Sequence, residues 1–209
     1  MFLTLNPLDD SKMERIYQAI CQVSPIPKDV WEKLPVPFFN LLELKAGHYF
    51  LKEGKPATHF GFVILGVLKE SYLTKKGDEY IKSFNFQGDF TGSYYDLLRG
   101  DPSTCSIRAI QNSVLAIANF NDFQVLFDKN LHWQRLGRRI AENLFIKKAR
   151  REYELLTLTA EERYKNLLAS RPKIEDELSQ IHISSYLGIT PVSLSRLKRK
   201  TKNNQLIKT

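Results

Sequence analysis

Short runs of β-prone apolar residues, separated by turns rich in glycine and proline, fill the chain from residue 40 to residue 119. These runs predict strands at residues 40–44, 60–65, 67–73, 80–86, 104–110 and 114–118. Turn signals such as Ala46-Gly47 and Lys76-Gly77-Asp78 stand between them. Many short strands at this spacing favour an antiparallel jelly-roll barrel.

Helical patterns flank this segment. They predict helices at residues 12–21 and 27–34, and Asn119 or Asn121 can cap a helix that leads the chain out of the barrel. A long helical pattern without proline then runs through residues 131–158. The chain is therefore expected to combine a barrel with separate helices, an α+β fold class.

Residues 181–200 predict two short helices joined by a tight turn. Gly188 can adopt a positive φ between the helices, Thr190 can cap the second one, and Pro191 suits its first position, where no N–H is needed. The apolar residues expected between the two helices are Ile183, Leu187, Ile189, Leu194 and Leu197. This layout is typical of a DNA-reading helix-turn-helix.

These elements divide the chain into three expected parts. Residues 1–119 form an effector-sensing barrel domain with N-terminal helices, residues 120–158 a connecting and dimerisation helix, and residues 159–209 the DNA-binding domain. The last part opens with a capping-box pattern, Thr159 followed three residues later by Glu162.

Leu136, Ile140 and Leu144 recur at four-residue intervals and form an apolar stripe on the long helix. The stripe can pack on the barrel of the same chain, or it can pair with its copy in a homodimer. We favour the homodimer, because a two-fold protein matches a two-fold DNA site.

The charge distribution also favours DNA binding by the C-terminal part of the chain. The net charge is +8, and residues 121–209 hold 18 Lys and Arg against 10 Asp and Glu, whereas the first 120 residues are balanced. From Pro191 onward there are six basic residues and no acidic one. Such an excess is expected of a phosphate-contacting surface, although a solvated basic tail would also produce it.

The sequence argues against a membrane protein, a secreted protein, a metalloprotein and an enzyme. No apolar run is long enough to cross a membrane and the N-terminus lacks signal-peptide features, so we expect a cytoplasmic protein without a membrane partner. Cys21 and Cys105 are too few and too distant for a disulfide framework or a metal cluster. The histidines, His48, His59, His132 and His182, include no closely spaced pair. We therefore expect no metal, no cofactor and no enzymatic activity.

Six motifs in a fixed order carry a resemblance to a known family. They are EG at 53–54, FVILG at 62–66, QGDFTG at 87–92, RA at 108–109, TAEERY at 159–164 and SYLGITP at 185–191. Together they resemble the Crp/Fnr superfamily of transcription regulators over nearly the whole chain, and the last two resemble shortened regulators of Bacteroidetes-type genomes. The resemblance implies a homodimer that binds double-stranded DNA and works with RNA polymerase.

The resemblance also implies a barrel of the cyclic-nucleotide-binding type. Members that bind cyclic AMP carry a Glu after the glycine that matches Gly92, and an Arg-Ser or Arg-Thr pair that clamps the phosphate. Ser93 and Ser103-Thr104 occupy these positions here. Ser93 offers no carboxylate and Ser103 no positive charge, so we predict that cyclic AMP is not the effector. Two possibilities stay open for the barrel: another effector, which the nearby aromatic residues favour as apolar or aromatic, or no ligand at all. These aromatic residues are Phe84, Phe86, Phe90, Tyr94 and Tyr95. The expected effector pocket consists of Phe90, Gly92, Ser93, Ser103 and Thr104.

The start of the second helix is expected to enter the major groove. The DNA-contacting residues that this predicts are Thr190, Pro191, Val192, Ser193, Ser195, Arg196 and Arg199. Arg196 is the main candidate, because a guanidinium can bond guanine O6 and N7 together. Lys198, Arg199 and Lys200 are expected to attract phosphates generally. Pro191 and Val192 replace an Arg and a Glu that contact bases in the best-known members, so their operator is not expected here.

Two alternatives stay open. A β-hairpin wing can turn at Asn203-Asn204, or the wing can be truncated, because nine residues follow Lys200. The chain can also be a ligand- or protein-binding module of the same fold, in which the helix-turn-helix serves dimerisation rather than DNA recognition.

Overall fold

The computed structural model describes residues 6–35 and 38–206. Its strands form two sheets with antiparallel pairing, such as that of Leu42 opposite Leu115. One sheet has the order β1 (Asn6–Pro7), β2 (Asn40–Leu44), β9 (Ser113–Asn119), β4 (His59–Leu65) and β7 (Phe90–Thr91). The other has the order β3 (Tyr49–Leu51), β8 (Ser106–Ala109), β5 (Val67–Leu73) and β6 (Glu79–Phe86).

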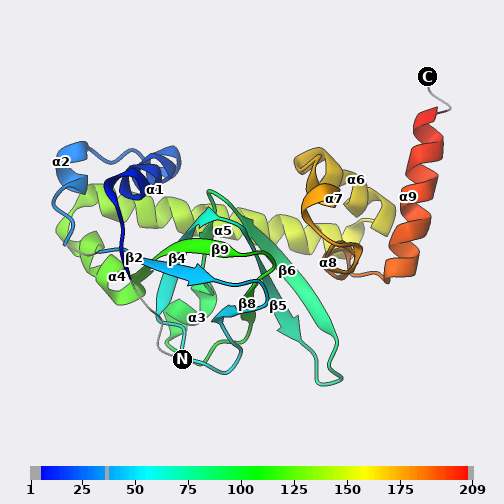
Figure 1. Cartoon of the computed structure of the whole chain (residues 1–209), viewed down its shortest axis with the longest axis horizontal. Helices are drawn as coiled ribbons and strands as arrows, with labels where there is room; N and C mark the ends of the chain where they lie inside the picture. Colours follow the sequence, from blue (N-terminus) through cyan, green and yellow to red (C-terminus); the bar gives the residue numbers. More distant parts are fainter. Residues whose placement is uncertain (1–5, 36–37, 207–209) are drawn as a thin grey trace. The chain divides into compact units, whose positions relative to one another are not determined.

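The helices precede, interrupt and follow these strands (Figure 1). They are α1 (Asp10–Val23), α2 (Lys28–Trp31), α3 (Tyr94–Arg99), α4 (Phe120–Lys129), α5 (Leu131–Thr157), α6 (Ala160–Ser170), α7 (Ile174–Glu177), α8 (Gln180–Leu187) and α9 (Pro191–Leu206). The predicted α+β class is confirmed. None of the described helices has the length and apolar content needed to cross a bilayer.

All six predicted strands are present, with slightly different ends, as β2, β4, β5, β6, β8 and β9. The short elements β3 and α3 were not expected from the sequence. β3 has only three residues, too few for an alternation of buried and exposed positions to stand out. α3 is a helix of six residues, which ends at Gly100 in the left-handed conformation, with φ 70°.

The chain divides into two compact units. The first consists of residues 1–72 and 83–144, and the second of residues 73–82 and 145–209. In the first unit, buried leucines and valines of both sheets, among them Leu68 and Leu115, pack between the sheets. The outer face of the five-stranded sheet is covered by helices (Figure 1). In this layer the rings of Trp31 of α2 and Trp133 of α5 have centroids 6.2 Å apart.

The apolar stripe of α5 belongs largely to this helix-covered core. Leu136 is fully buried there and Ile140 packs against it, whereas Leu144 is 39% exposed. Gly137 next to Leu136 lets α5 approach the Phe127 ring so closely that an added Cβ would meet it at 2.3 Å. Leu136 therefore does not face a partner copy, because its own chain covers it. Ile140 is only partly buried, so its expected part in dimerisation, like that of Leu144, stays a prediction.

The second unit contains the end of α5 and the helices α6 to α9. Residues 73–82 join it through Ser185, whose hydroxyl accepts the Ile81 N–H at 3.1 Å and donates to the Glu79 carbonyl at 2.7 Å. Helix α9 continues to Leu206 and includes Asn203 and Asn204. In the described part of the chain this stretch is thus helical, and a hairpin turn at these two asparagines is excluded.

Candidate DNA-binding surface and barrel pocket

Helix α8 and the turn after it are fixed by local chemistry. Ser179 caps the helix by accepting the His182 N–H at 3.4 Å. Gly188 ends it with φ 69°, a conformation that costs glycine little because it has no Cβ. The predicted role of Gly188 as the inter-helix turn is confirmed.

Helix α9 starts as the sequence predicts. Thr190 accepts the Ser193 N–H at 3.2 Å, and Pro191 is the first helical residue. Leu194 is fully buried, as are Ile183 and Leu187 of α8. These three side chains fix the angle at which α9 leaves the turn, since their burial ties its inner face to α8.

The opposite face of α9 is exposed. Val192 is 61% exposed, and Arg196 and Arg199 are also exposed. At about 100° per residue these three side chains share one face of the helix. Thr190 and Pro191 are exposed as well, and Ser193 and Ser195 are partly buried. The predicted DNA-contacting residues are thus neighbours on the first turns of α9.

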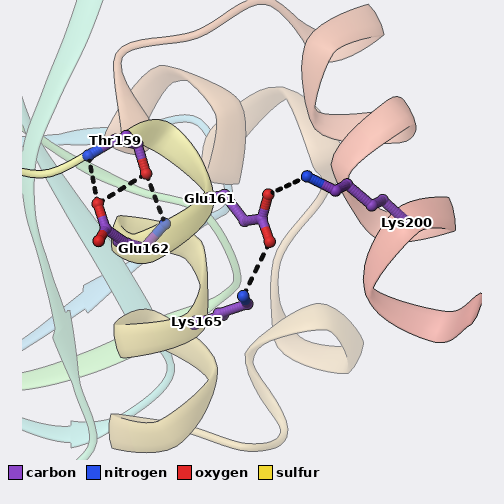
Figure 2. A network of polar contacts seen from close by, with 5 residues as sticks. All are labelled: Thr159, Glu161, Glu162, Lys165 and Lys200. Carbon is purple, nitrogen blue, oxygen red and sulfur yellow. Dashed lines mark hydrogen bonds and ion pairs between the residues drawn. The ribbon is translucent and has the colours of Figure 1, made fainter. Parts of the chain in front are cut away.

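Part of the basic cluster is neutralised within the second unit. The Lys200 ammonium lies 2.7 Å from a Glu161 carboxylate oxygen, whose other oxygen is 2.8 Å from Lys165 (Figure 2). Hydrogen bonds from Lys165 and Lys200 lower the pKa of Glu161 to about 2. Lys198 pairs with Glu175 at 2.7 Å. In the described residues, neither Arg196 nor Arg199 forms an ion pair.

Two arginines that the sequence analysis did not select hold the helices of this unit together. Arg163 donates to the Leu158 carbonyl at 2.5 Å and to the Leu187 carbonyl at 3.0 Å, so it joins the ends of two helical segments. Arg151 of α5 donates to the Tyr186 carbonyl and lies over the Tyr186 ring, 3.9 Å from its centroid. Both arginines bind carbonyls that the ends of helices leave free.

The helix α6 begins with the predicted capping box. Thr159 Oγ1 accepts the Glu162 N–H at 3.3 Å, and the Glu162 carboxylate accepts the Thr159 N–H at 2.8 Å (Figure 2). Tyr164 on the same helix is buried and donates to Glu175 at 2.5 Å. The motif at residues 159–164 therefore positions α6 and, through Glu175, the acidic group that pairs with Lys198.

In the barrel, three of the predicted pocket residues converge on one carboxylate, that of Asp96 in α3. The hydroxyl of Ser93 donates to Asp96 Oδ2 at 2.5 Å. The hydroxyl of Ser103 lies 2.9 Å from the same oxygen and 2.9 Å from the Cys105 carbonyl, so its one hydrogen serves these two acceptors. Thr104 donates its N–H to Asp96 Oδ2 at 3.1 Å and its hydroxyl to Oδ1 at 3.2 Å. Asp96 has no exposed surface. Burial raises its pKa, but these hydrogen bonds outweigh that effect and hold the pKa below its usual value.

The other two predicted pocket residues lie differently. Gly92 has φ 146°, and an added Cβ would meet the Phe60 backbone at 3.3 Å. Phe90 packs edge-on against Phe62, with centroids 5.6 Å apart, and against the helix-covered core. Phe90 is therefore part of that core packing rather than of the hydroxyl cluster. The sequence analysis did not single out Asp96, because two of its donors, Ser103 and Thr104, come from a separate segment of the chain.

Comparisons with known proteins agree with this architecture. Residues 41–130 match the model of the cyclic nucleotide-binding domain family. No curated protein matches the chain. FixK2 from Bradyrhizobium japonicum is similar, with a TM-score of 0.71 and 19% identity over 80% of this chain and 86% of that chain.

Two further structures cover more of the chain. CLP from Xanthomonas campestris, a c-di-GMP-responsive global regulator, has a TM-score of 0.64 and 16% identity over 95% of this chain and 94% of its own. A Crp/Fnr-family regulator from Eubacterium rectale has a TM-score of 0.67 and 14% identity over 86% and 85%. The resemblance to Bacteroidetes regulators gains no support from these comparisons. The chain thus has the fold of Crp/Fnr-type regulators, with a cyclic nucleotide-binding domain match at residues 41–130.

Proposed function

We propose that this protein is a sequence-specific DNA-binding transcriptional regulator. The observation that carries the proposal is the exposed face of α9, where Val192, Arg196 and Arg199 lie together while Leu194 anchors the opposite face. An exposed helix start with guanidinium groups on one face suits the major groove, where arginine can bond guanine and the methyl group of thymine accepts apolar contact. The proposed site of action is cytoplasmic DNA, with RNA polymerase as a further partner.

The proposal includes a homodimer, and the exposed part of α5 supports it. Phe145 and Leu156 are 72% and 78% exposed, and Ala149 and Glu152 between them are exposed too. The intervals of four, three and four residues place all four on one seam of the helix, the spacing of a coiled coil. Arg151, which holds Tyr186, lies on a different face of α5. We propose this seam, in place of the fully buried Leu136, as the contact between two copies.

The regulator that we propose does not respond to cyclic AMP. The segment from Gly92 to Thr104 forms the cassette of the barrel, to which Ser93 and Ser103 bring no charge, and both of their hydroxyls donate to Asp96. A cyclic phosphate at Ser103-Thr104 would meet the Asp96 carboxylate, and repulsion between the two anions would add to the cost of desolvating the phosphate.

The test is an electrophoretic mobility shift with the DNA upstream of the protein's own gene. A shift that resists random competitor DNA and weakens steeply with salt supports the regulator. No shift at low salt, with or without cell extract as a source of effector, would contradict it and favour a binding module. Calorimetry that showed micromolar or tighter binding of cyclic AMP would contradict the proposed lack of response.

A further inference from the structure

The cassette of the barrel encloses an anion that belongs to the chain itself. Four donors, the hydroxyls of Ser93, Ser103 and Thr104 and the N–H of Thr104, point to the carboxylate of Asp96 at distances of 2.5 to 3.2 Å. Ser93, Asp96 and Ser103 are all buried. This is the hydrogen-bonding environment of a bound anion, built from two separate segments of the chain.

All four donors are electrically neutral. In the part of the chain that the structure describes, no lysine or arginine pairs with Asp96, so hydrogen bonds alone compensate the buried charge. An uncompensated carboxylate would be very costly to bury, and hydrogen bonds to a charged acceptor are stronger than those between neutral groups. The donors therefore select for a negative charge at this place.

The carboxylate also closes the cassette. Ser93 and Asp96 belong to the start of α3, whereas Ser103 and Thr104 belong to the segment that leads into β8. Asp96 thus ties the two segments together. Because it is attached to the chain, it has a high effective concentration at the donors, and a free anion in solution competes poorly with it.

We propose that Ser93, Ser103 and Thr104 form an anion-binding site that this protein fills with its own Asp96 carboxylate. A small free carboxylate takes this place when the side chain is shortened. The wild-type barrel then needs no anionic effector, and its cassette is held closed in the absence of ligand. This inference concerns the barrel alone and holds whether or not the protein binds DNA.

Chemical rescue of the full-length Asp96→Ala variant tests the proposal. Thermal unfolding is compared in sodium formate and in sodium chloride at equal ionic strength and neutral pH. Formate is expected to raise the Tm of Asp96→Ala by about 3 °C or more beyond chloride, and to leave wild type unchanged. Asp101→Ala, which removes an exposed carboxylate of the same loop, is the matched control and is expected to show no formate effect.

Further variants separate an anion site from a loss of packing. In Asp96→Ala combined with Ser103→Ala, the formate effect is expected to shrink, because one donor is gone. Asp96→Asn keeps the size of the side chain but removes the charge, and its Tm is expected to fall below that of wild type. The proposal is overturned if formate does not raise the Tm of Asp96→Ala above its value in chloride, or does not refold this variant where it is unfolded in chloride. It is also overturned if formate raises the Tm of wild type equally, or if Asp96→Asn is as stable as wild type.

Discussion

The ammonium group of Lys200 lies 2.7 Å from a carboxylate oxygen of Glu161, so a lysine of the basic C-terminal cluster is neutralised within its own unit. Lys198 is paired in the same way with Glu175. A count of charges along the sequence treats these lysines as equal to Arg196 and Arg199. The structure distinguishes them, and the distinction leads to different expectations for variants of each.

Replacement of Glu161 by glutamine is expected to strengthen non-specific DNA binding, because it releases Lys200. We expect a lower Kd for a random duplex. The slope of log K against log salt concentration should also steepen by the amount expected for about one additional phosphate contact. Fluorescence anisotropy at several salt concentrations measures both. Asp176→Asn removes one exposed negative charge from the same unit without releasing a lysine, and is expected to have the smaller effect. Equal changes in DNA affinity for the two variants would show that Glu161 does not withhold Lys200 from DNA.

Replacement of Arg196 by alanine is expected to weaken binding at the specific site by about 1–3 kcal/mol and to relax the preference at one base pair. The exposed position of Arg196 on α9 gives it access to base edges. Binding to a set of single-base operator variants measures the effect. Lys200→Ala serves as the comparison, with a smaller expected loss. A uniform loss on all sequences would make Arg196 a phosphate contact instead.

The second unit is expected to lose stability at acid pH through Glu161. Its pKa is lowered from 4.5 to about 2 in the folded state by Lys165 and Lys200. A lowered pKa means that the contribution is fully present above the unfolded value and is lost as the pH falls from about 4.5 toward 2. Thermal unfolding between pH 7 and pH 2 measures this, and Glu161→Gln is expected to show a weaker acid dependence. An unchanged profile would show that the ion pairs contribute nothing.

A charge on the exposed seam of α5 is expected to dissociate the homodimer. Leu156→Glu would replace an apolar contact of the proposed seam by a second carboxylate beside Glu152, so the protein should elute as a monomer while its thermal stability as a monomer is retained. Light scattering coupled to gel filtration measures the mass. Ile181→Glu, a change at another exposed apolar residue, is the control and should leave the mass unchanged. A dimer that survives Leu156→Glu would place the interface elsewhere.

Replacement of Leu136 by alanine is expected to act on folding rather than on assembly. Its side chain is fully buried in the core of the first unit, so the cavity should cost about 2–5 kcal/mol of unfolding free energy. Denaturant unfolding measures the loss. If Leu136→Ala were a monomer with an unchanged free energy of unfolding, Leu136 would belong to the dimer interface instead.

Much of the fold follows from local signals in the sequence. Short β-prone apolar runs between turns located the main strands, and Gly188, Thr190 and Pro191 marked the helix-turn-helix, because φ preferences and capping depend on a few neighbouring residues. The capping box of Thr159 and Glu162 could be predicted from the sequence for the same reason. The resemblance, rather than a local signal, placed Ser93, Ser103 and Thr104 in one expected pocket.

The tertiary structure decided which side chains meet. The four-residue spacing of Leu136 and Ile140 shows that they share a face, and only the packing shows that their own core covers that face. The pairing of Lys200 with Glu161 joins residues 39 positions apart, and no local pattern encodes it. Asp96 reads as an ordinary polar residue in a short helix until its donors converge on it. Sequence alone therefore determined the elements and the motifs, whereas long-range contacts decided which charges are neutralised and which apolar surface stays free.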